Sequence, residues 1–69
     1  IITDSILHIE SQGADMTMVE VYDPAGQLVA TARPMARTCA IDITNHTSQI
    51  FIVRTTLADS TVASLKLAR

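Results

Sequence analysis

Apolar and polar side chains alternate with a period of two along most of this 69-residue chain. Leu7 and Ile9 share one side of an extended segment, and Val19 and Val21 share one side of another. The same pattern recurs in three further sets: Leu28, Ala30 and Ala32; Cys39, Ile41 and Ile43; Ala63, Leu65 and Leu67. Such faces are typical of antiparallel strands with one side in a core and the other in water. The alternation therefore predicts an all-β chain.

The segment 50–55 departs from this pattern because both of its faces are apolar. Phe51 and Val53 lie on one face, and Ile50 and Ile52 lie on the other. This composition favours a central strand covered on both sides, or an edge strand that meets a partner. The second option predicts that the chain can associate with itself edge to edge.

Turn residues divide the alternating segments. The run Asp23-Pro24-Ala25-Gly26 has Asp, Pro and Gly where a type I turn and a following left-handed residue favour them. It predicts a hairpin of strands 16–22 and 27–33, and Pro34 is expected to end the second strand because it has no N–H for a ladder. Further loops or turns are expected at 11–15, 45–48 and 58–60.

The last segment, 61–69, fits two structures. Val62, Leu65 and Ala68 have a spacing that also suits a helix, but the β-branched Thr61 and Val62 directly follow a turn and favour a strand. The chain then has about six to seven short strands. This number predicts a small immunoglobulin-like antiparallel β-sandwich that occupies residues 1–69 as a single domain.

Composition excludes several function classes. A hydrophobic fraction of 48% with 17% charged residues argues against disorder. The net charge is −2 and no basic patch with interleaved aromatics occurs, so nucleic acid is not an expected partner. No apolar run approaches a transmembrane segment. The chain begins without Met and without signal-peptide features, so we expect a fragment of a longer chain.

The sequence predicts no enzyme, cofactor or metal site. Cys39 is the single cysteine, and its register with Ile41 and Ile43 predicts a small core residue rather than a nucleophile. His8 and Glu10 share a strand face, but two ligands do not make a metal site. We expect them on a solvated surface.

One ordered set of motifs resembles the C-terminal domains of the type IX secretion system, which sort exported proteins in certain Gram-negative bacteria. Residues 19–29, VEVYDPAGQLV, resemble the family segment v-x-v-y-D-x-x-G-x-x-V. Residues 41–43 are similar to its i-D-l/v strand, 48–54 to s/p-G-x-Y-i-v-r/k, 63–69 to its closing strand, and 4–9 to its first strand. Gln49 and Phe51 replace the family's usual glycine and tyrosine, and the family's Asn-Pro entry to the first strand is absent.

The resemblance implies a secretion signal. The domain would be exported to the periplasm, recognised there by the outer-membrane translocon and its shuttle protein, and in many cargos removed by a surface sortase. The mature protein would reach the cell surface or medium. The candidate recognition residues lie at the hairpin tip and in the last strand: Asp23, Gly26, Lys66, Leu67 and Arg69.

Four of the candidates also have a structural interpretation. Asp23 and Gly26 are expected to make the turn itself. Leu65 and Leu67 are expected to fill the sandwich, and Lys66 to protect an edge strand. The alternative function is an immunoglobulin- or fibronectin-like spacer or binding module of an extracellular protein. A sorting signal must end its parent chain, whereas a spacer can lie anywhere.

Overall fold

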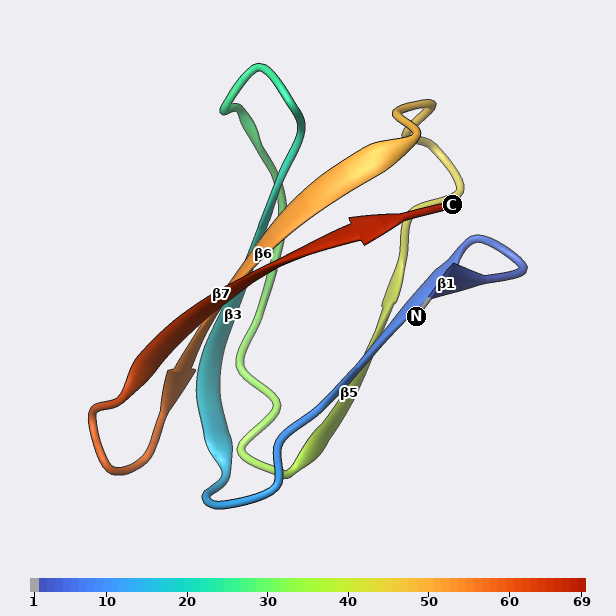
Figure 1. Cartoon of the computed structure of the whole chain (residues 1–69). Helices are drawn as coiled ribbons and strands as arrows, with labels where there is room; N and C mark the ends of the chain where they lie inside the picture. The colour runs from blue at the N-terminus through green and yellow to red at the C-terminus, as the bar shows by residue number, and fades with distance from the viewer. Residues whose placement is uncertain (1) are drawn as a thin grey trace.

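A computed structural model describes residues 2–69, which form seven strands and no helix (Figure 1). The strands are β1 (Ile2–Thr3), β2 (Ile6–Glu10), β3 (Met16–Tyr22), β4 (Leu28–Ala32), β5 (Thr38–Asp42), β6 (Ile50–Leu57) and β7 (Val62–Ala68). They make two antiparallel sheets of order β1-β2-β5 and β4-β3-β6-β7. The predicted all-β sandwich is confirmed, as are the hairpin of β3 and β4 and the strand at 61–69.

The core lies between the two sheets and comes from the alternating faces. Leu7 and Ile9 of β2 are buried against Val19 and Val21 of β3, as the period of two predicts. The full set of buried apolar residues is Leu7, Ile9, Met16, Val19, Val21, Ile41, Ile43, Phe51 and Val53. Complete burial of such a side chain stabilises the fold by about 1.5–3 kcal/mol.

The prediction that Leu28 lies on the same face of β4 as Ala30 and Ala32 is wrong. Val21 pairs with Ala30 but Tyr22 pairs with Leu28, so Val29 is an extra residue in the ladder. A one-residue bulge reverses the faces on its two sides. Val29 therefore packs against the core, and Leu28 is 52% exposed.

β6 is a central strand of its sheet, between β3 and β7. Phe51 and Val53 are fully buried, but Ile52 on the opposite face is 39% exposed. The expectation of a strand covered on both sides is therefore wrong, because the outer face of the four-stranded sheet lies open. The alternative of an edge strand is wrong too.

β7 forms an edge of the four-stranded sheet and is the least buried of the long strands. Leu65 pairs with the buried Val53 and so lies on the inner face, yet it is 42% exposed. Leu67 pairs with Phe51 and packs against the core. The expectation that both leucines fill the sandwich is right for Leu67 and wrong for Leu65, since the smaller sheet does not cover this part of β7.

The sequence did not predict the short hairpin of β1 and β2. Asp4 and Ser5 join Thr3 to its partner Ile6, and both have positive φ angles, 53° and 62°. Two left-handed central residues define a type I′ turn, which matches the twist of a hairpin. The resemblance had placed Asp4 and Ser5 in the first strand, which is wrong. The turn lacks the Asn-Gly or Asp-Gly pair that normally reveals it.

Candidate interaction surfaces

The structure brings the five candidate recognition residues to one end of the four-stranded sheet. Tyr22, Ile52 and Lys66 are neighbours in successive strands, β3, β6 and β7. The turn at 23–26 leaves β3 at this end, and Arg69 follows β7 at the same end (Figure 1). Tyr22 and Lys66 are separated by two strand spacings, about 10 Å.

Asp23 and Gly26 build the hairpin tip. The Asp23 carboxylate oxygen Oδ1 accepts hydrogen bonds from the N–H groups of Ala25 at 3.0 Å and Gln27 at 2.9 Å. Gly26 N donates to the carbonyl of Asp23 at 3.0 Å, and the φ angle of Gly26 is 87°. A left-handed residue after a type I turn is where glycine is favoured. The predicted turn-forming roles of both residues are confirmed, and residues 24–27 of the tip are exposed.

Arg69 fastens the end of β7 to both sheets. Its guanidinium donates to the carbonyl of Ser48 at 3.0 Å, to that of Ile43 at 3.1 Å and to that of His46. It also lies 3.5 Å from the hydroxyl of Ser5 and 5.6 Å from the centre of the Phe51 ring. The side chain thus joins β7 to the β5–β6 loop and to the β1–β2 turn. These contacts give Arg69 a structural role that spacing in the sequence could not reveal.

Lys66 and Leu67 point to opposite faces of β7. Leu67 packs against the core, whereas Lys66 is exposed on the outer face. The Lys66 side chain makes no hydrogen bond or ion pair within residues 2–69. Lys66 is therefore the candidate residue whose side chain is most available to a partner.

The outer face beside Lys66 carries a polar cluster that the sequence analysis missed. The Tyr22 hydroxyl donates to Glu20 Oε2 at 3.0 Å, and Arg54 is the cross-strand neighbour of Glu20. The hydrogen bond to Glu20, with some burial, raises the pKa of Tyr22 above its usual value. Once β3 and β6 are known to pair, the outward positions of both strands identify this cluster.

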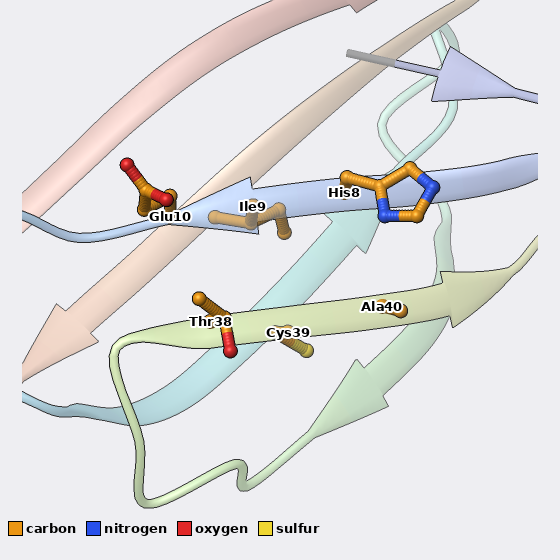
Figure 2. A pocket seen from close by; sticks show the side chains of 6 residues that line it. All are labelled: His8, Ile9, Glu10, Thr38, Cys39 and Ala40. Atoms are coloured by element: carbon orange, nitrogen blue, oxygen red, sulfur yellow. The ribbon is translucent and has the colours of Figure 1, made fainter.

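The smaller sheet has a shallow hollow of about 540 Å³ across β2 and β5. Figure 2 shows His8 and Glu10 on β2, with Thr38 and Cys39 on β5. Cys39 is half-buried against the core, and burial raises the pKa of its thiol, which disfavours the reactive thiolate. Cys39 thus packs at the margin of the core, on the inner side that its register with Ile41 and Ile43 predicts, and is not fully buried. In the described part of the chain no three His, Cys, Asp or Glu residues are grouped to hold a metal.

A second groove of about 120 Å³ opens between β2 and the inner face of β7. Ile9 lines one side, and Ala63 and Leu65 line the other. Thr55 lies in its wall, 95% buried, and its hydroxyl has no hydrogen-bond partner among residues 2–69. This groove is the point at which the sandwich is incompletely closed.

Comparison with known protein families assigns the chain to one of them. A family model described as a domain of unknown function, DUF8694, matches residues 1–68. The chain belongs to this family. No curated protein and no solved structure matches this DUF8694 domain. Within residues 2–69 there is no helix of the length and hydropathy needed to cross a membrane.

Proposed function

We propose that this DUF8694 domain is a C-terminal sorting signal for type IX secretion. The observation that best supports this proposal is the order of the motifs along the fold. The segment v-x-v-y-D-x-x-G falls on β3 and its turn, i-D-l/v on β5, and the closing motif on β7. Motifs held in this order on one sandwich would give the parent chain a fixed surface that a secretion system can recognise.

The domain acts in this proposal as a signal and a substrate, without catalysis. It folds in the periplasm and is recognised by the outer-membrane translocon and its shuttle protein. A surface sortase then removes it or leaves it attached, and the parent protein reaches the cell surface or medium. Lys66 and the hairpin tip are the proposed points of recognition, because they are exposed at the same end of the sheet.

One observation favours the alternative of a spacer module. Asp23, Gly26 and Arg69 each have a role inside the fold. A spacer needs nothing more from these residues than a stable sandwich. The two functions therefore differ in whether exposed residues such as Lys66 matter.

The deciding experiment is a localisation test. Residues 1–69 are fused to the C-terminus of a periplasmically exported reporter in a host with an intact type IX system. Transport of the reporter to the surface or medium, lost when the system is inactivated, supports a sorting signal. A folded fusion that stays in the periplasm contradicts it and supports the spacer.

A matched pair of charge reversals locates the recognition surface. Lys66→Glu is expected to reduce surface delivery several-fold, and Arg37→Glu, an equal charge change at an exposed position in the β4–β5 connection, is expected to leave it unchanged. Both variants should fold, because surface substitutions usually change stability by less than about 0.5 kcal/mol. Equal surface delivery of the reporter by both variants would show that Lys66 is not part of the recognised surface.

A further inference from the structure

The outer edge of β7 carries unpaired backbone groups. β6 and β7 pair without a register shift, from Thr56 opposite Val62 to Ile50 opposite Ala68. At the ends of this ladder, Leu57 N donates to Thr61 O at 2.8 Å and Arg69 N donates to Gln49 O at 2.9 Å. Since bonded residues alternate along an antiparallel strand, the odd-numbered residues of β7 bond to β6. The N–H and C=O groups of the even-numbered residues point outward: Val62, Ser64, Lys66 and Ala68.

The side chains along this edge are mostly apolar and exposed. Leu65 is 42% exposed on the inner face beside the groove at Thr55, and Val62 is 49% exposed on the outer face. Lys66 is the single charged residue within β7. A long, regular edge with one charge is suited to strand addition.

We infer that β7 pairs antiparallel with β7 of a second copy of this chain, about a two-fold axis at Leu65. A symmetric contact requires a strand that complements itself. On the inner face, Leu65 then meets Leu65 of the second copy, and Ala63 meets Leu67. On the outer face, Ser64 meets Lys66 and Val62 meets Ala68. All residues of β7 take part, and each outward backbone group finds a partner.

Neighbouring registers are poorer. A shift of two residues in one direction places Lys66 directly opposite Lys66 of the second copy, and like charges in that position are destabilising. A shift of two residues in the other direction places Ser64 opposite Ser64 and leaves Leu67 and Ala68 outside the paired strands. The register centred on Leu65 avoids both defects. It also makes one continuous sheet from the two four-stranded sheets.

Sedimentation of the 69-residue chain from micromolar concentration to about 1 mM tests this pairing, which does not depend on a role in secretion. A monomer–dimer equilibrium is expected. Ser64→Glu places a carboxylate opposite Lys66 of the second copy at two symmetric positions, and should lower the dimer Kd about threefold to tenfold. Ser64→Lys should raise it. A purely monomeric chain, or weaker pairing of the Glu variant, overturns the inference.

Lys66→Pro tests the role of the backbone. Proline removes an outward N–H that a second copy would use, while the bonds from β7 to β6 come from the odd-numbered residues. The dimer Kd should rise at least about tenfold with the β-sheet signal retained. Lys66→Ala, which keeps the N–H, should pair as well as the parent or better. An equally tight dimer in the Lys66→Pro chain overturns the inference.

Amide exchange in the unmodified chain provides a measurement that requires no variant. The N–H groups of Ser64 and Lys66 should exchange more slowly as the protein concentration rises. The N–H of Thr31 on the opposite edge strand β4 should not respond. Exchange at Ser64 and Lys66 that is independent of concentration, in a sample that sediments as a dimer, places the interface elsewhere.

Discussion

The two outer hairpins of the four-stranded sheet share a turn geometry but differ in sequence and in their edges. Gly26 N donates to Asp23 O in one hairpin, and Ser60 N donates to Leu57 O in the other. The left-handed residue is Gly26, at φ 87°, in the first and Ser60, at φ 71°, in the second. The same left-handed backbone conformation is thus adopted by glycine in one turn and by serine, which disfavours a positive φ angle, in the other.

The edge strands behind these turns differ as well. β4 has a bulge at Val29 and is followed by Pro34, which are both features that discourage strand addition. β7 pairs regularly over its whole length and exposes Leu65. The backbone of β4 therefore protects one edge of this sheet against strand addition. The other edge, β7, has little protection besides Lys66.

Replacing the glycine should produce the largest change in stability. Gly26→Val puts a β-branched residue at φ 87° and should lower the free energy of unfolding by about 2 kcal/mol. Gly13→Val is the matched control, because Gly13 also has open space around it but no positive φ. Urea denaturation measures both. Equal losses would show that the left-handed conformation of Gly26 is not what the turn requires.

Removing the guanidinium should loosen the far end of the β6–β7 hairpin. Arg69→Ala leaves the carbonyls of Ile43 and Ser48 without their donor and should cost about 1.5 kcal/mol, since hydrogen bonds from a charged group exceed neutral ones and solvent offsets part of the loss. Arg33→Ala, an exposed arginine that follows β4, is the control. Thermal denaturation measures both variants. An equal change in their melting temperatures would contradict the proposed role of Arg69 in holding β7 to the two sheets.

The sequence predicted the features that depend on local chemistry. Alternation identified Val19 and Val21 as core residues, and Asp23 and Gly26 marked their turn. Leu28 was misplaced because a bulge leaves no mark in a hydrophobic pattern. The turn at Asp4 and Ser5 was missed because it lacks glycine and asparagine.

The candidate surfaces were harder to predict because they depend on contacts between distant residues. Arg69 lies 26 positions from Ile43 and 64 from Ser5, and no pattern along the chain relates them. Likewise, the exposure of Leu65 depends on which strands the smaller sheet contains, whereas its alternation with Ser64 and Lys66 indicates only a face.

Thr55 offers a stabilising change on the inner face of β6, beside β7. Its buried hydroxyl has no partner among residues 2–69, so Thr55→Val replaces an unsatisfied polar group by a methyl of similar size. We expect a gain of about 1 kcal/mol in the free energy of unfolding. Thr56→Val, one residue along on the other face, should change little. A loss of stability in Thr55→Val would mean that the hydroxyl is hydrogen-bonded within the groove.

Ser60→Gly makes the second turn resemble the first. It relieves the left-handed strain of Ser60 but adds freedom to the unfolded chain, so the expected net gain is about 0.5 kcal/mol. Ala58→Gly in the same turn adds the same freedom without relieving strain and should destabilise. A gain in the free energy of unfolding for Ser60→Gly with a loss for Ala58→Gly would show that strain at Ser60 distinguishes the two turns. A loss in both variants would show that Ser60 is not strained.

The smallest effect concerns the acid dependence of the β6–β7 turn. Hydrogen bonds from Thr61, including its backbone N–H at 3.0 Å, hold the pKa of Asp59 below its usual value of 3.8. Because the unfolded chain then binds the proton more readily, stability is present above about pH 4 and decreases as the pH falls through the folded-state pKa. Asp59→Asn keeps an acceptor oxygen without the titration, and should show a smaller loss between pH 6 and pH 3 in urea denaturation. Asp15→Asn, also the loss of one exposed carboxylate, is the control. An unchanged acid loss in Asp59→Asn would show that this carboxylate does not contribute to the turn.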